Sequence, residues 1–103
     1  MPSRAAKEAR FISIAARCQP AVELAQDRKR LAIVSHIELA LALGSIYEAL
    51  APYERDSKTG TFVVRVSGES VPGRTAATLD SLSTVRDRLE DELLRRRTPR
   101  GTA

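Results

Sequence analysis

The sequence predicts a mainly α-helical chain built on an antiparallel helical hairpin, with a short β-hairpin between its two long helices. Apolar residues recur at helical spacing over most of the chain, whereas one stretch, "TFVVRVSG", has the period of a strand. The 103 residues suffice for one domain with a small core. We expect a single helical oligomerisation domain over residues 1–97, with a basic N-terminal helix, and a flexible tail over residues 98–103.

The first helix is expected from Ser3, which provides an N-cap, to Cys18. Its apolar residues follow i, i+3, i+4, i+7 spacing and form one stripe, made of Phe11, Ile14, Ala15 and Cys18. Three basic residues lie on another side: Lys7, Arg10 and Arg17. Gln19-Pro20 then interrupts the helix, because proline lacks a backbone donor and disfavours helix at the residue before it.

The second helix is expected over residues 21–50. Its first third is polar and ends in "DRKR", whereas the remainder is apolar nearly all round. A helix with no polar face must be covered on all sides, and two other helices of so short a chain can hardly do this. We therefore expect a homo-oligomer whose subunit contacts include Ile37, Leu39, Leu43, Ile46, Tyr47, Leu50, Phe62 and Val64.

After Pro52, "ERDSKTG" is expected to be a polar turn, followed by a strand around residues 61–67 and a short return strand near Val71. The last helix is expected over residues 75–97. Its apolar stripe consists of Ala76, Leu79, Leu82, Leu89 and Leu93. Two i, i+4 ion pairs, Asp91–Arg95 and Glu92–Arg96, are expected to stabilise it.

The sequence favours the cytoplasm. "LAIVSHIELALALGSIYEAL" is long and apolar, but a membrane span would place Glu38 near mid-membrane at a cost of about 2.5–3.5 kcal/mol. The N-terminus has no apolar region of the signal-peptide type. The single cysteine, Cys18, cannot form an intrachain disulfide, which is typical of a reducing compartment. We expect no membrane association.

No motif indicates an enzyme, a cofactor or a metal. No Gly-Lys-Ser/Thr follows any of the glycines, so a phosphate-binding loop is not expected. His36 is the only histidine and is expected to be packed or interfacial, and Cys18 is expected to be a core residue. The acidic residues between Asp87 and Glu92 are interleaved with arginines, which predicts a solvated, salt-bridged face.

What remains is basic charge, with a formal net charge of +4. We expect DNA to be bound through phosphate contacts, because a symmetric oligomer would repeat each basic group and phosphate binding scales with the charges presented together. The N-terminal basic group has few acidic neighbours and is the expected DNA contact: Lys7, Arg10, Arg17, Arg28, Lys29 and Arg30. A second basic group, Arg95, Arg96, Arg97 and Arg100, already has local partners in the final helix.

Residues from about Asp27 to Gly101 resemble the small terminase subunits of tailed double-stranded-DNA phages and related gene transfer agents. A helix rich in Ala, Leu and Tyr ("LAIVSHIELALALGSIYEALAPYE") leads into a turn and short β segment ("SKTGTFVVRVSG"), then a Leu-spaced helix ("VPGRTAATLDSLSTVRDRLEDELL") and "TPR". The resemblance implies a ring-forming helical core that binds packaging DNA and recruits the large terminase ATPase. It also implies that the second basic group, Arg95, Arg96, Arg97 and Arg100, docks the large subunit.

The chain departs from this family in two places. Val71-Pro72 stands where members often have Asn-Pro, and no separate helix-turn-helix domain precedes the core. The second departure implies DNA binding without sequence preference. Two other functions stay open: a small virus- or plasmid-encoded protein that inhibits a host protein, and a basic, dimeric DNA-binding regulator.

Overall fold

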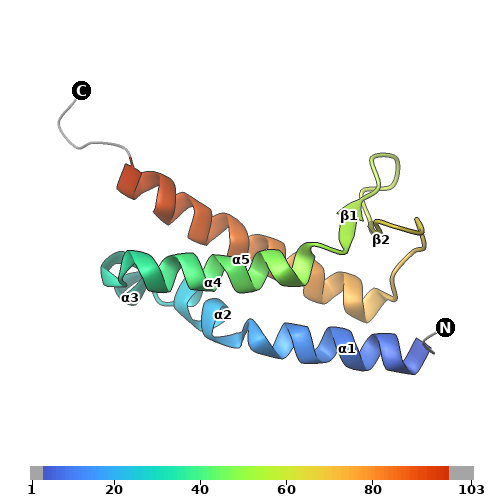
Figure 1. The fold of residues 1–103 in the computed structure, drawn as a ribbon. Helices are drawn as coiled ribbons and strands as arrows, with labels where there is room; N and C mark the ends of the chain where they lie inside the picture. The colour runs from blue at the N-terminus through green and yellow to red at the C-terminus, as the bar shows by residue number, and fades with distance from the viewer. Residues whose placement is uncertain (1–3, 98–103) are drawn as a thin grey trace.

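The computed structural model describes the backbone of residues 4–97 and the side chains of residues 10–97 (Figure 1). The expected tail over residues 98–103, with Arg100, lies outside the described residues, and so does the side chain of Lys7. The elements in chain order are α1 (Arg4–Arg17), α2 (Gln19–Gln26), α3 (Arg28–Ile33), α4 (His36–Leu50), β1 (Tyr53–Arg55), β2 (Phe62–Val64) and α5 (Gly73–Arg97). The predicted fold class is confirmed: the chain is mainly helical, with a small antiparallel sheet between α4 and α5.

The predicted continuous helix over residues 21–50 is wrong, because the chain divides it into α2, α3 and α4. Asp27 leaves the helical conformation, with φ −108° and ψ 95°, and its carboxylate accepts a hydrogen bond from the Arg30 N–H at 3.1 Å. Ser35 starts α4 in the same way, its Oγ accepting from the Glu38 N–H at 3.1 Å. Each cap satisfies a backbone donor that a new helix start leaves free.

The sheet has two strands, and the partner of β2 is not the predicted one. Phe62–Val64 pairs with β1, Tyr53–Arg55, so that Tyr53 lies opposite Val64. The predicted return near Val71 is reduced to a single bridge between Val63 and Ser70. Gly60, at φ 73°, provides the left-handed residue of the connecting turn, where its N–H donates to Asp56 O at 2.7 Å.

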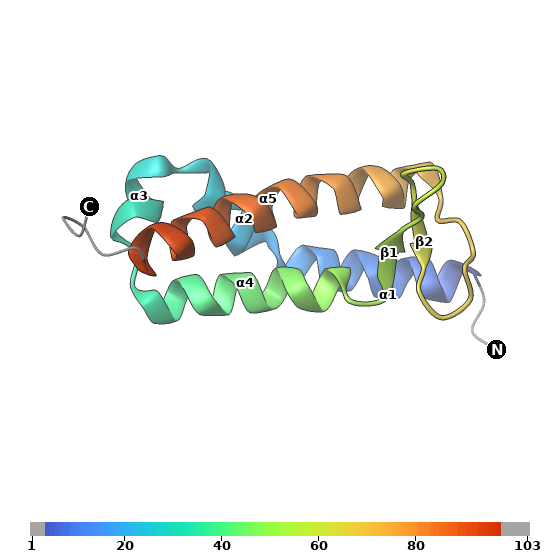
Figure 2. The ribbon, with the colours of Figure 1, turned by 90° about the horizontal axis from the view of Figure 1, so that it is seen from above.

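The core lies between the α4–α5 pair and the layer formed by α1 and α2. Figures 1 and 2 show α4 and α5 running side by side in opposite directions, with α1 and α2 across one face of the pair. The largest fully buried side chains come from α4, α5 and the α1–α2 junction: Leu39, Ile46, Leu79, Leu89 and Cys18. The predictions of a core cysteine and of an apolar stripe on the last helix are thus confirmed for Cys18, Leu79, Leu82 and Leu89.

The β-hairpin is anchored to the helices by aromatic and charged contacts. The ring of Phe11, on α1, meets that of Tyr53 edge-on at a centroid distance of 5.8 Å. Arg55 stacks over the Phe62 ring at 4.3 Å and pairs with Asp80 of α5 at 2.6 Å. These contacts provide the packing that a lone hairpin lacks.

Candidate nucleic-acid interface

The antiparallel return of α5 brings two basic segments to one end of the molecule (Figure 2). We call this surface the basic end and define it by the exposed residues Arg28, Lys29, Arg30, Arg88, Arg95 and Arg97. Residues 27–34 and 88–97 together hold seven basic and four acidic residues. Charge that is spread over two distant parts of the sequence is therefore concentrated in space.

The structure divides the predicted DNA-contact group. Arg10 lies on α1, which extends toward the end opposite α3 in both ribbon views, and the side chain of Lys7 on the same helix is not described (Figures 1 and 2). Arg17, 69% exposed, lies 3.8 Å from Glu48, an exposed pair that contributes little to stability. Arg28, Lys29 and Arg30 are instead grouped with the arginines of α5.

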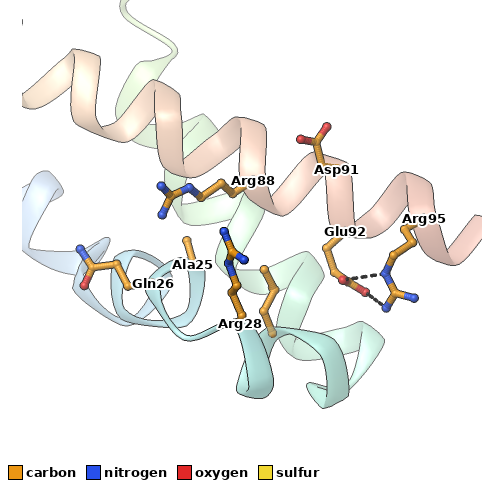
Figure 3. A pocket seen from close by; sticks show the side chains of 8 residues that line it. Ala25, Gln26, Arg28, Arg88, Asp91, Glu92 and Arg95 are labelled. Carbon is orange, nitrogen blue, oxygen red and sulfur yellow. Dashed lines mark hydrogen bonds and ion pairs between the residues drawn. The ribbon is translucent and has the colours of Figure 1, made fainter.

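A hollow of about 310 Å³ lies between the α2–α3 turn and α5 (Figure 3). Arg28 and Arg88 come from separate helices and turn into the same space, with Gln26 nearby. Asp91 points away from it, and Glu92 is directed toward Arg95. The full lining is Ala25, Gln26, Arg28, Leu31, Arg88, Asp91, Glu92 and Arg95.

Glu92 is the buried acidic residue of this region, with only 8% of its side chain exposed. Its carboxylate accepts hydrogen bonds from Arg95 Nε at 3.0 Å, from Arg95 Nη2 at 2.6 Å and from Arg96 Nε at 2.7 Å. The Arg95 hydrogen bonds, with help from Arg96, lower the pKa of Glu92 although burial acts in the opposite direction. Glu92 is therefore ionised and paired with Arg95 and Arg96, and it forms no ion pair with Arg28 or Arg88.

Arg96 acts as a clamp between α5 and the α3–α4 turn. Its Nη2 donates to Leu31 O at 3.1 Å and to Val34 O at 2.8 Å, and its side chain is 20% exposed. These carbonyls belong to the end of α3, where they have no intrahelical donor. The Arg96 guanidinium is therefore committed within the chain, which leaves Arg97 as the member of the predicted docking group that is exposed and unpaired among the described residues.

One of the two predicted ion pairs of the last helix forms and the other does not. Glu92 pairs with Arg96 at 2.7 Å, as predicted. Arg95 pairs with Glu92 at 2.6 Å instead of with Asp91. The reason is geometric, because the buried carboxylate of Glu92 has four lone-pair sites and accepts both arginines.

Most of the predicted oligomer contacts face the chain's own core. The buried ones are Leu39, Leu43, Ile46, Leu50 and Phe62, and Val64 is partly buried. Tyr47 is 45% exposed, and its hydroxyl donates a hydrogen bond to the Glu90 carboxylate of α5. Their role between subunits stays a prediction, with Ile37 and Tyr47 as the exposed members.

Three large aliphatic residues, of which only Ile37 was among the predicted contacts, are exposed next to the basic end. Ile37 and Leu41 lie one turn apart on α4 and are 73% and 68% exposed, and Ile33 at the end of α3 is 84% exposed. We call these three residues the apolar group. Exposed aliphatic side chains that form one patch can mark a protein contact, and the apolar group is the candidate for such a patch on this side of the molecule.

Within the described part of the chain, no cluster of histidine, cysteine and acidic residues could hold a metal ion, and no helix is both long and apolar enough to cross a membrane. His36, predicted to be packed or interfacial, is exposed at the start of α4 within this chain. The chain matches no protein-family model, no curated protein and no solved structure.

Sequence reasoning missed Arg88 and Gln26 as members of the site. Arg88 lies among acidic residues in the sequence, which suggested a neutralised face. No ion pair involving Arg88 occurs among the described residues, because Glu92 is taken and Asp91 points elsewhere. Arg88, Arg95 and Arg96 all lie within reach of Glu92 in the sequence. Spacing alone does not show which of them Glu92 pairs with, so the sequence carried no signal that Arg88 would be left without a partner among the described residues.

Proposed function

We propose that this protein is a non-enzymatic, homo-oligomeric adaptor that binds double-stranded DNA through phosphate contacts at its basic end. The observation that carries the proposal is the grouping of Arg28, Lys29 and Arg30, all exposed and without an ion pair among the described residues, beside the arginines of α5. Exposed, uncompensated cations are the groups that release counterions from a phosphate backbone.

The geometry favours contacts with phosphates over contacts with bases. α3 is only six residues long, and it is tied to α5 through Arg96 rather than projecting from the surface. Reading bases in the major groove requires an element that enters the groove with several side chains. Binding is therefore largely independent of DNA sequence and strongly dependent on salt.

Self-association is the second part of the proposal. The apolar group, Ile33, Ile37 and Leu41, begins three residues after Arg30, so subunits that bury it would bring their basic ends close together. The helix–β-hairpin–helix order of α4 to α5 agrees with the resemblance to small terminase subunits. By that resemblance, the protein serves viral DNA packaging and recruits the large terminase ATPase, with the exposed Arg97 as a docking residue.

A second function is favoured by one observation. The exposed apolar group could equally receive a host protein that the chain inhibits, and this would need no affinity for DNA. Mass measurement in solution separates the functions. A multimer of many subunits supports the packaging adaptor, a dimer supports a DNA-binding regulator, and a monomer that captures a partner supports the inhibitor.

Two variants with equal loss of charge test the DNA contact. Arg28→Gln/Lys29→Gln/Arg30→Gln removes three cations from α3, and Lys7→Gln/Arg10→Gln/Arg17→Gln removes three from α1. Each lost phosphate contact lowers affinity roughly tenfold near 0.1 M salt, so the α3 variant is expected to bind any duplex about 100-fold or more weakly. Its salt dependence should also flatten.

The α1 variant is expected to keep most of the affinity, with the oligomer intact in both proteins. An α3 variant that binds as the parent does, or a parent that binds no duplex at low salt, would remove the DNA-binding part of the proposal. Fluorescence anisotropy with two duplexes of unrelated sequence measures both affinity and sequence preference.

A further inference from the structure

The hollow between the α2–α3 turn and α5 has the chemistry of a binding site for a single anion, and we call this site the seat. Its polar lining comprises Arg28, Arg88, Arg95, Gln26, Asp91 and Glu92, with the guanidinium groups of Arg28 and Arg88 turned into it, and Ala25 and Leu31 provide apolar lining (Figure 3). Its volume of about 310 Å³ is sufficient for a small oxyanion with some of its water. The site is built from residues of three elements, α2, α3 and α5, rather than from one helix end.

Two acidic residues, Asp91 and Glu92, also line this space, but neither forms an ion pair with Arg28 or Arg88 among the described residues. Arg88 has Asp91 and Glu92 at i+3 and i+4, the positions at which a helical ion pair forms. Glu92 instead accepts from Arg95 and Arg96, and Asp91 is directed away from the hollow. No ion pair of Arg28 or Arg88 occurs among the described residues, so two like charges converge on one hollow. Their repulsion is relieved when an anion binds between them.

We propose that this hollow binds one phosphate group, held by Arg28 and Arg88 and oriented by Gln26. Guanidinium groups present planar pairs of N–H donors that match two oxygens of a phosphate, and two of them can bind different oxygens of a tetrahedral group. A carboxylate has only two oxygens in one plane and uses fewer of these donors. The phosphate can be a free ion or a phosphodiester of DNA, and only the second source rests on the function proposed above.

The first experiment uses the full chain and potassium phosphate at constant ionic strength. Side-chain resonances of the arginine Nε–H groups and of the Gln26 amide are followed by NMR during the titration. We expect Arg28, Arg88 and Gln26 signals to shift together and saturate, and Arg88→Gln to weaken phosphate binding about tenfold. Arg74→Gln is the matched control, because Arg74 is an exposed residue of α5 without an ion pair among the described residues.

Three results would contradict the proposed phosphate site: no saturable shift in the parent protein, an equal loss of phosphate affinity in Arg74→Gln and Arg88→Gln, or acetate binding at least as tightly as phosphate. Circular dichroism verifies that both variants keep the parent's helix content. Arg88→Lys, which keeps the charge but loses the planar donors, should bind phosphate with intermediate affinity.

Duplex DNA added to the same proteins identifies the source of the phosphate. If Arg88→Gln weakens duplex binding about tenfold more than Arg74→Gln does, the seat holds a DNA phosphodiester. If duplex binding is equal in both variants while phosphate binding is lost only in Arg88→Gln, the seat holds a free phosphate ion. A parent that binds phosphate but no DNA would reject the proposed function and retain the seat.

Discussion

Replacing Arg96 by methionine tests how the chain is held together at its basic end. Methionine keeps much of the length and packing of the side chain but removes every donor. The replacement abolishes the bond to the Glu92 carboxylate at 2.7 Å and the bonds to Leu31 O and Val34 O at 3.1 and 2.8 Å. The end of α3 then loses the donors that cap its carbonyls, and α5 loses its link to the α3–α4 turn.

The size of the effect follows from these three bonds. A hydrogen bond to a charged group contributes about 1.5–3 kcal/mol when it is buried. Two terms reduce the sum: the Arg96 side chain is 20% exposed, so water replaces part of what is lost, and Glu92 keeps both bonds from Arg95. We expect a net loss of about 2 kcal/mol in the free energy of unfolding. For a chain of this size, this corresponds to a decrease in Tm of roughly 10 °C.

Urea denaturation followed by far-ultraviolet circular dichroism measures the loss, with Arg97→Met as the matched control. Arg97 is the next residue on the same helix, is exposed and has no ion pair among the described residues, so its replacement should change the free energy of unfolding by less than about 0.5 kcal/mol. Equal midpoints for the two variants would show that the Arg96 hydrogen bonds do not hold α5 to the turn.

Three further predictions concern self-association and titration. Leu43 is 4% exposed, so Leu43→Asp should unfold the subunit. Ile37 is 73% exposed, so Ile37→Asp should keep the helix content but dissociate the proposed oligomer. Native mass spectrometry measures this, and an intact oligomer in Ile37→Asp would contradict it. The hydrogen bonds from Arg95 hold the pKa of Glu92 below its ordinary 4.5. The stability that ionised Glu92 contributes is therefore present above pH 4.5 and is lost as the pH falls through the lower pKa of the folded state. The urea midpoint of Glu92→Gln should vary less with pH in acid than that of the parent. The hydrogen bond to Glu90 raises the pKa of Tyr47 above 10.0. The stability that this hydrogen bond contributes is lost as the pH rises through the higher pKa of the folded state. The phenolate absorbance of Tyr47 should therefore appear at lower pH in Glu90→Gln.

The helices that follow from apolar periodicity were predictable from the sequence. The first and last were expected over residues 3–18 and 75–97 and are found at Arg4–Arg17 and Gly73–Arg97. The breaks at Asp27 and Ser35 were not predicted. The apolar pattern of residues 31–50 continues through Ser35 and hides that break, and neither break contains a proline or glycine. The break at Ser35 had a local signal, because Ser35 and Glu38 have the spacing of a capping box, which marks a helix start.

The first strand could not be predicted from its own three residues. "YER" is too short to show a period, and its pairing with Phe62–Val64 depends on contacts made across the chain. Tyr53 packs on Phe11 and Arg55 on Phe62 and Asp80. Such tertiary contacts decide whether a short segment becomes a strand.

The candidate site was predicted only in part, because neighbours in sequence are not neighbours in space. Arg28, Lys29 and Arg30 were expected to act with the cations of α1, but the antiparallel path of α4 and α5 places α3 beside the C-terminal part of α5. Arg28 thus shares a hollow with Arg88 and Arg95. The acidic residues of α5 were expected to neutralise its arginines. Burial of Glu92 concentrates that neutralisation on Arg95 and Arg96 and leaves Arg88 to face the hollow.

The apolar character of α4 connects the two surfaces. Leu39, Leu43 and Ile46 supply the core of the single chain, so the apolar residues that remain for a partner are those on the outer side, at Ile37 and Leu41. This outer side begins only a few residues after the last cation of α3. One basic end offers few phosphate contacts, and its affinity for DNA at physiological salt would be low. Burial of the apolar group between subunits would place several basic ends along one duplex, and affinity would then rise through the number of linked contacts without any change in a single contact.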